Sequence, residues 1–333
     1  MKKQFVMMFL IMCFTLPASQ AFASPKYSLR FAGQFALNHY VTAEMQAMAG
    51  EIGKKTNGDV QITVFPANQL GDYTLIYEDI IRGTVDMCMN SFPSQFDKRL
   101  EIVYMNGFVR GPKDILHAIT PDSWMFKKLD SMQSVFGIKM LGMYFEGVGG
   151  YASIKPVKAP LDPKVPKGVL LRIPNMAVYK LSAEATGYRT VTIPWADVYQ
   201  SLQTGVCDAV TGFSPTACNA MLGDIIKHYY VTLNSVELLN IAISAKTWDK
   251  LPEKYKKVIQ EVVDKYSIRS VEIGMQESNK AIKALEGKGI KVYQYTPEEL
   301  LPLASAYVST WDQLSNRMTK ELVEEFKKEM SPK

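Results

Sequence analysis

An arginine held by rigid backbone is the side chain in this sequence best suited to binding a small anion. Arg172 ends a β-rich run and is followed by Ile173 and by Pro174, which keeps its predecessor extended. A planar guanidinium offers paired donors that fit a carboxylate edge and stays charged at any relevant pH. The alternative is a local ion pair with an acid such as Asp197. Arg172 is therefore either a carboxylate-binding arginine or a structural one.

Two further side chains near Arg172 have types that suit a ligand pocket. Trp195 follows Pro194, and a buried tryptophan supplies apolar area together with an N–H donor. Asn175 follows Pro174 and carries an amide that both donates and accepts hydrogen bonds. Ordinary core packing is the alternative for Trp195, and a helix N-cap is the alternative for Asn175.

The sequence gives little support for catalysis. His39, His117 and His228 lie far apart without the spacing of metal ligands. Neither a Gly-x-Ser-x-Gly elbow nor a phosphate-binding glycine loop occurs. We therefore expect no catalytic residue, no metal, no cofactor and no enzyme activity, although His39, in the loop after the first predicted strand, could line a cleft.

The N-terminal segment, residues 1–23, has the pattern of a secretory signal peptide. Lys2 and Lys3 precede the apolar stretch from Phe5 to Phe14, and Ala21-Phe22-Ala23 resembles a cleavage site. Cys13 follows Met12 rather than a small residue, so we expect no lipid anchor. No later segment approaches the ~20 apolar residues of a membrane-spanning helix. The pattern predicts a soluble exported protein.

The remaining chain of about 310 residues is long enough for two domains with full cores. Cys88, Cys207 and Cys218 remain after cleavage, either as buried free thiols or with one bridge between Cys207 and Cys218. Removing Lys2 and Lys3 lowers the formal charge from +5 to +3, and the basic residues are scattered. We expect no nucleic-acid partner.

Strand and helix patterns alternate in two separate parts of the chain. The first part predicts strands at 27–32, 60–64 and 85–89, with helices between them. The second part predicts strands at 168–173, 190–193 and 207–211, again with intervening helices. The two parts are separated by the proline-containing loop at 159–167, which indicates two α/β domains with parallel sheets. From Pro252 to about Leu285 a helical apolar stripe predicts one rod of ~50 Å, or two helices broken near Gly274.

The stretch from Gly168 to Pro215 resembles the central signature of the substrate-binding proteins of tripartite ATP-independent periplasmic (TRAP) transporters. Its matching parts are a strand ending in Arg-x-Pro, a helix closing on Gly187, Pro194-Trp195-x-Asp-Val-Tyr, and Leu202-Gln-Thr-Gly-x-x-Asp. The segments Thr56-Asn-Gly, VFPANQLGD at 64–72 and Gly83-Thr-Val-Asp-Met follow in the family's order. The resemblance covers the whole mature chain.

The resemblance implies a periplasmic-binding-protein fold of two lobes with mixed or parallel sheets. We expect an N-terminal lobe of residues 24–147 plus about 238–272 and a C-terminal lobe of 148–237 plus about 273–333, with the helix at 252–286 crossing both. Arg172 would grip a ligand carboxylate, Asn175 would reach the ligand, and Trp195 would lie against its body. Strand ends add positional candidates; these are Gln34, Phe35, Tyr73, Asn90, Ser91, Phe213 and Ser214.

Two departures from the family pattern bear on the ligand. Gly149, within Glu146–Tyr151, stands where many members have a second arginine, and the segment 208–215 lacks an asparagine that often braces the carboxylate. We therefore expect a ligand with one carboxylate and a less polar remainder that contacts Trp195, Phe213 and Tyr151. The expected function is capture of a small organic acid by a monomer that delivers it to TRAP membrane subunits. A sensor that docks on a receptor is the alternative.

Overall fold

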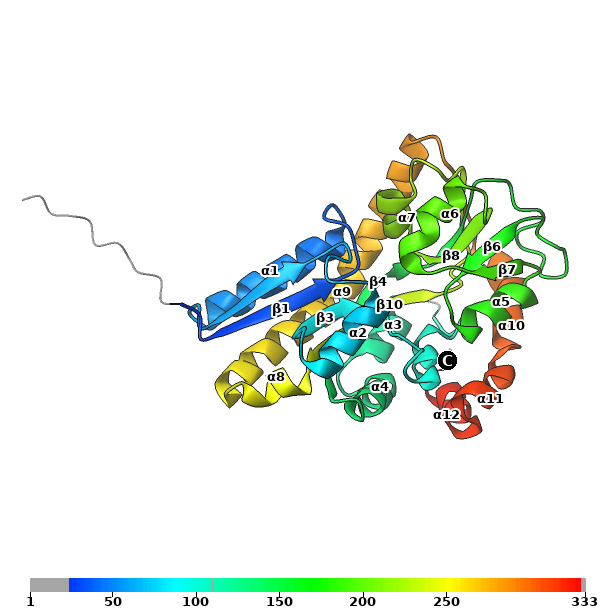
Figure 1. Ribbon diagram of the computed structural model, residues 1–333. Helices are drawn as coiled ribbons and strands as arrows, with labels where there is room; N and C mark the ends of the chain where they lie inside the picture. Colours follow the sequence, from blue (N-terminus) through cyan, green and yellow to red (C-terminus); the bar gives the residue numbers. More distant parts are fainter. Residues whose placement is uncertain (1–23, 110, 331–333) are drawn as a thin grey trace, which may run out of the picture.

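The computed structural model describes residues 24–109 and 111–330, which form two α/β lobes (Figure 1). The predicted signal peptide lies outside these residues. In the described part of the chain, no helix combines the length and the apolar character that crossing a membrane requires. The expected two-lobed α/β class is confirmed.

The sheet of the N-terminal lobe has five strands in the order β2-β1-β3-β10-β4. The strands are β1 (Tyr27–Gly33), β2 (Val60–Phe65), β3 (Met87–Asn90), β4 (Ile138–Val148) and β10 (Val236–Ser244). The helices of this part are α1 (Tyr40–Lys55), α2 (Tyr73–Arg82), η1 (Lys98–Tyr104), α3 (Pro112–Ile119), α4 (Trp124–Ser134) and α8 (Ala245–Lys250). α1 buries the predicted stripe of Val41, Met45, Met48 and Ile52. α2 ends at Gly83, whose φ of 79° closes the last turn at no steric cost.

The sheet of the C-terminal lobe has six strands in the order β11-β9-β5-β8-β6-β7. The strands are β5 (Gly150–Ser153), β6 (Leu170–Ile173), β7 (Arg189–Thr192), β8 (Ala209–Phe213), β9 (His228–Val231) and β11 (Lys291–Gln294). The helices of this part are α5 (Ala177–Ala185), η2 (Trp195–Asp197), α6 (Val198–Gln203) and α7 (Pro215–Met221). β6 pairs in parallel with both β7 and β8, as the alternation of strands and helices predicts.

Two strand connections carry the chain between the lobes. β4 runs into β5 through Gly149, and the return from β9 to β10 runs through Ser235. The two connections are joined, because the Gly149 amide donates to the Ser235 carbonyl at 2.7 Å. β10 pairs antiparallel with β3 and β4, and β5 pairs antiparallel with β8 and β9, so both sheets are mixed.

α9 (Glu253–Gly287) is one continuous helix of 35 residues, not two broken at Gly274. It packs against β4 and α1 of the first lobe and against α7 and β11 of the second. Figure 1 shows it running behind both lobes. A helix of this length is therefore a third element that ties the lobes together.

Gly274 has a packing role in α9 that yields a stability prediction. A Cβ at this position would lie 2.7 Å from Phe145 Cδ1 and 3.0 Å from the Phe145 carbonyl oxygen. Alanine gains ~1 kcal/mol in helix propensity, but overpacking of a close contact costs ~1–3 kcal/mol. We expect Gly274→Ala to lower the free energy of unfolding by about 1 kcal/mol in urea denaturation.

Gly50 in α1 is the matched control for this prediction. It is exposed, and a Cβ there would meet nothing within 4 Å. Gly50→Ala is therefore expected to raise the free energy of unfolding by about 1 kcal/mol. If both substitutions stabilise the protein equally, the close contact with Phe145 is not a constraint.

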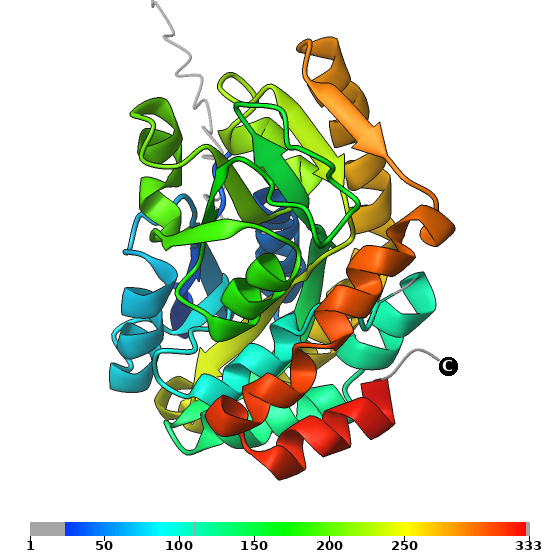
Figure 2. The same cartoon turned by 90° about the vertical axis from the view of Figure 1, so that its right-hand side faces the viewer.

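The C-terminal segment divides between the two lobes. α10 (Pro297–Val308) packs against α5. The next elements, which pack on the N-terminal lobe, are η3 (Trp311–Leu314), α11 (Ser315–Met318) and α12 (Lys320–Met330). Figure 2 shows these C-terminal helices, coloured red, at the bottom of the molecule. Phe326 of α12 packs edge-on against Phe108 and Trp124, with ring centroids 5.5 and 6.2 Å apart. From the sequence we expected all of 273–333 in the C-terminal lobe; residues 311–330 differ, because Arg317 pairs with Glu101 of η1 and Phe326 packs against Phe108 and Trp124.

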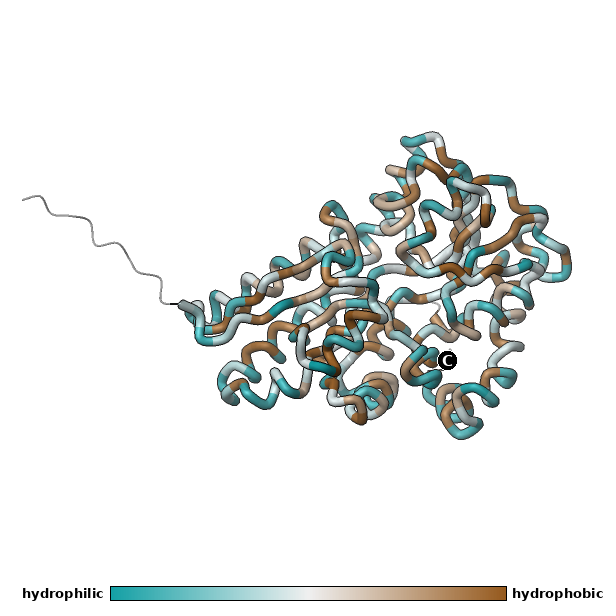
Figure 3. The backbone as a smooth tube through the Cα atoms, viewed as in Figure 1, coloured by the Kyte–Doolittle hydropathy of each residue, from teal (hydrophilic) through white to brown (hydrophobic). Residues whose placement is uncertain are grey.

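The cores of the lobes account for the apolar pattern of the chain. Figure 3 shows hydrophobic and hydrophilic segments alternating along the helices, as expected for helices with one packed face. Cys88, Cys207 and Cys218 are free and buried. Burial raises the pKa of the Cys88 thiol to about 12 and that of Cys207 to about 11, so both thiols stay protonated. The interpretation as buried thiols holds, and the Cys207–Cys218 bridge does not form.

Candidate functional site

A cavity lies between the lobes, where strand ends of both sheets meet. Its empty volume, including the open mouth, is about 500 Å³. The first lobe contributes residues that follow β1 and β3 together with the start of α2, and the second contributes β6 and η2. The crossing strands β4 and β10 form part of the wall. This position, at strand ends and between lobes, is typical of ligand sites in α/β proteins.

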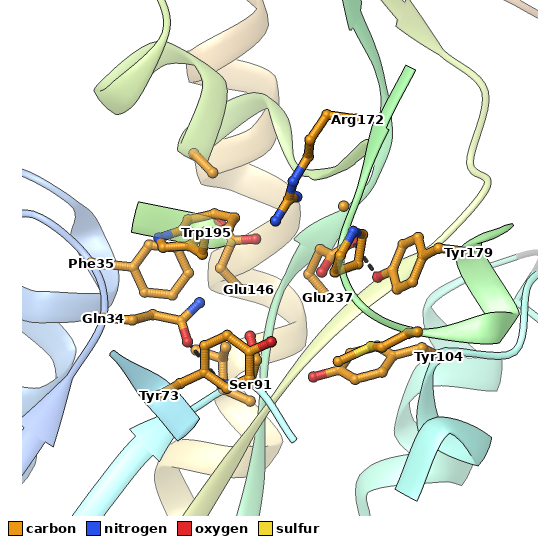
Figure 4. A pocket seen from close by; sticks show the side chains of 15 residues that line it. Gln34, Phe35, Tyr73, Ser91, Tyr104, Glu146, Arg172, Tyr179, Trp195 and Glu237 are labelled. Carbon is orange, nitrogen blue, oxygen red and sulfur yellow. Dashed lines mark hydrogen bonds between the residues drawn. The ribbon is translucent and has the colours of Figure 1, made fainter. Parts of the chain in front are cut away.

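Arg172 enters this cavity from β6 (Figure 4). The residue is 2% exposed. Its Nε donates to the Ile193 carbonyl at 2.8 Å and its Nη1 to the Thr211 carbonyl at 3.3 Å. In the described part of the chain Arg172 forms no ion pair, so the alternative pairing with Asp197 is absent. The two carbonyls fix the guanidinium while its Nη2 keeps its donors for another group.

Burial lowers the pKa of Arg172 to about 10, yet the side chain remains charged at neutral pH. A buried cation without a direct ion pair is costly, and the cost falls when an anion binds in contact with it. The arrangement therefore favours a bound anionic group in the cavity.

Aromatic rings form one side of the cavity. Trp195 lines it, and its ring stacks on Phe213 with centroids 4.2 Å apart and an interplanar angle of 11°. Phe35, from the other lobe, meets Trp195 edge-on at 6.0 Å. The Trp195 Nε1 is buried and has no hydrogen-bond partner among the described residues. Phe213 does not line the cavity; it supports Trp195 from behind and lies 5.8 Å from the Arg172 guanidinium.

Three other predicted residues of the first lobe lie on the cavity wall. Gln34, Tyr73 and Ser91 line it together with Phe35. The Gln34 Oε1 accepts from the Ser91 amide at 2.8 Å, which joins the ends of β1 and β3. The positional argument from strand ends thus placed these residues in one site.

Besides Phe213, four predicted residues lie away from the wall. Asn175 is exposed, and the N-cap of α5 is Met176 rather than Asn175. Asn90 is buried, with neither side-chain polar atom bonded in the described structure. Ser214 caps α7 and donates to the Glu146 carboxylate at 2.6 Å, so it lies behind the wall. Tyr151 stacks on Tyr188 at 4.5 Å inside the C-terminal lobe.

The cavity also contains residues that sequence analysis missed. Glu146 of β4 and Glu237 of β10 line it, as do Tyr104, Met176 and Tyr179. A signal for the acids was present, because each is an isolated glutamate in an apolar strand, in MYFEGV and SVELLN. Lone charges in otherwise buried strands point to a site.

Gly149 leaves no room for a second arginine on the crossing strand. A Cβ there would lie 2.1 Å from Ser235 Oγ and 3.1 Å from Glu237 Oε1. Among the described residues of the wall, Arg172 is the one basic side chain. The described wall thus offers a single cationic side chain.

Two mixed sheets, crossing strands and a cavity between the lobes define the class of two-lobed solute-binding proteins. Residues 31–318 match the family model of the bacterial extracellular solute-binding proteins, family 7 (DctP). The chain belongs to this family.

The chain is also similar in sequence and in structure to solute-binding proteins whose ligands are named. The sialic acid-binding periplasmic protein SiaP of Vibrio cholerae is 23% identical over 286 residues, covering 85% of this chain and 86% of that protein. The C4-dicarboxylate-binding periplasmic protein DctP of Rhodobacter capsulatus is 23% identical over 273 residues, covering 81% of each. A TRAP periplasmic solute-binding protein of Desulfovibrio salexigens with bound orotic acid superposes with a TM-score of 0.82 at 19% identity, covering 91% of this chain and 98% of that one.

Proposed function

We propose that this protein is exported to the periplasm, captures a small carboxylate in the cavity between its lobes, and delivers it unchanged to the membrane subunits of a TRAP-type transporter. The observation that carries the proposal is Arg172, a buried guanidinium that lines the cavity and forms no direct ion pair with a described residue. Membership of a solute-binding family and the ligands named for its relatives, which include succinate and L-gulonate, support it.

The proposed binding step begins at the C-terminal lobe. A ligand carboxylate pairs with Arg172 and its body lies against Trp195. The N-terminal lobe then closes, bringing Phe35, Gln34 and Tyr73 over the ligand. Closure removes water from the ion pair, which strengthens it because the local dielectric falls. The crossing strands and α9 are the elements on which the lobes would rotate.

A thermal-shift screen of organic acids tests this function. The compounds should include hydroxy acids, oxo acids, dicarboxylates, amino acids and sugar acids. A ligand at about 100 times its Kd adds roughly 2.7 kcal/mol to the free energy of unfolding, which raises Tm by several degrees. Mass spectrometry of the recovered ligand should find it unchanged. If no carboxylate raises Tm, or if the ligand is turned over, the proposal is wrong.

A further inference from the structure

Two glutamates face the same cavity as Arg172, on neighbouring strands. Glu146 lies on β4 and Glu237 on β10, and these strands pair with Glu237 opposite Gly147. Figure 4 shows the guanidinium of Arg172 above both carboxyl groups. The cavity therefore brings one basic and two acidic side chains together.

Among the described residues, each glutamate accepts hydrogen bonds with only one of its two carboxylate oxygens. Glu146 Oε1 accepts from Ser214 Oγ at 2.6 Å and from Thr216 Oγ1, and lies 3.2 Å from His39 Nε2. Glu237 Oε1 accepts from Ser235 Oγ at 2.5 Å and from Tyr179 Oη at 3.3 Å. Within the described structure, Oε2 of each makes no hydrogen bond. Two carboxylate oxygens in the cavity wall therefore lack donors.

The charges in the cavity are unfavourable for a ligand that carries only a carboxylate. Such a ligand would pair with Arg172 but would add a third acidic group near Glu146 and Glu237. Like charges held close together in a buried site repel strongly. A ligand that also carries a cation relieves this repulsion and supplies donors to the free oxygens, since an ammonium group has three.

We propose that the solute is a zwitterion, an amino acid or similar amine-bearing carboxylate, whose carboxylate binds Arg172 and whose protonated amine binds between Glu146 and Glu237. This inference rests on the proposed function and names its ligand class. The amine supplies a positive charge to the two glutamates, because the described cavity wall has only one basic side chain, Arg172.

Matched ligand pairs separate this inference from the proposed function. Calorimetry would compare amino acids with hydroxy acids of the same carbon skeleton and with the plain acids. The amine-bearing member of the best pair is expected to bind at least about tenfold more tightly. Equal or tighter binding of the hydroxy or plain acid overturns the zwitterion but leaves carboxylate capture standing. The absence of binding by every carboxylate overturns both.

The pH dependence of ligand affinity is a second test, because it is expected to have opposite signs for an amine-bearing acid and a plain acid. Burial, followed by the influence of Glu146, raises the pKa of Glu237 to about 7. Raising the pH from 6 to 8 ionises Glu237, so an amine ligand is expected to bind about tenfold more tightly. A plain acid would instead bind more weakly. The charged and titratable groups near Glu237 are Arg172, Glu146, Tyr104, Tyr179 and Tyr229, and His39 lies behind Glu146.

Substitutions of the two glutamates test whether they cause the preference for an amine-bearing ligand. Glu237→Gln is expected to weaken amine binding at pH 8 at least tenfold and to remove most of the pH dependence. Glu146→Gln should also lower the preference for the amine over the hydroxyl. The control is Glu261→Gln, an exposed glutamate of α9, which should change neither. A melting curve would check that each variant is folded, and an unchanged amine preference in both folded site variants overturns the proposal.

Discussion

Replacing Arg172 with alanine is expected to weaken ligand binding by about 3–5 kcal/mol, the usual loss when one partner of a buried ion pair is removed. The guanidinium is 2% exposed and is fixed by the carbonyls of Ile193 and Thr211, and no other described residue of the cavity wall is basic. Isothermal titration calorimetry with a ligand found by the screen would measure the change. Arg172→Lys should recover only part of the loss, because an ammonium cannot make the same paired contacts.

Arg189 is the matched control, an exposed arginine on the neighbouring strand β7. Arg189→Ala removes the same charge without touching the cavity, so its affinity should stay near that of the unmodified protein. Equal losses in both variants would mean that net charge, rather than a contact of Arg172, governs affinity. An unchanged affinity in Arg172→Ala would rule out the proposed anchor.

The second large effect is expected at the joint between the C-terminal helices and the two lobes. Glu101 is fully buried; its Oε1 pairs with Arg317 Nη2 at 2.7 Å, and its Oε2 accepts from the Val178 amide at 3.1 Å. Arg317→Ala would leave the Glu101 charge buried without a cation, which costs about 3 kcal/mol, near the low end for such pairs because Arg317 is partly exposed. Urea denaturation would measure the decrease in the free energy of unfolding.

A surface pair on α12 provides the comparison. Lys327 is partly exposed and pairs with two exposed acids, Glu324 at 3.0 Å and Asp312. Lys327→Ala is expected to cost less than about 1 kcal/mol. Adding Glu101→Gln to Arg317→Ala should restore part of the lost stability, because the uncompensated charge is then gone. If Lys327→Ala and Arg317→Ala cost the same, burial of Glu101 does not matter.

Local sequence patterns predicted most of the elements and the position of Arg172 at the end of a strand, from which it lines the cavity. The apolar stripe of α1, the stop at Gly83 and the unbroken run after Pro252 each act over a few residues, so they can be recognised without knowing the fold. The same holds for Gln34, Tyr73 and Ser91, since each follows a strand or begins a helix, and strand ends meet at one edge of a sheet.

The structure differs from the sequence-based expectations in the direction of single side chains and in the packing of distant segments. Asn175 is exposed, although its neighbours Pro174 and Met176 line the cavity, because a change of one position in extended backbone reverses the side chain. Tyr151 lies on a strand of the C-terminal lobe but points into its core. Residues 311–330 return to the first lobe, and no local pattern specifies which apolar surface a terminal helix covers.

By itself the sequence determined the α/β class, the helical apolar stripe after Pro252 and the presence of one guanidinium held by a rigid strand. These follow from periodicity and backbone restriction, which are short-range. Only the tertiary structure decided that Glu146 and Glu237, 91 positions apart, lie on paired strands in the same cavity as Arg172. Charges on separate strands combine into one electrostatic environment when the lobes come together, because Coulomb interactions depend on distance in space and on the loss of water rather than on sequence separation.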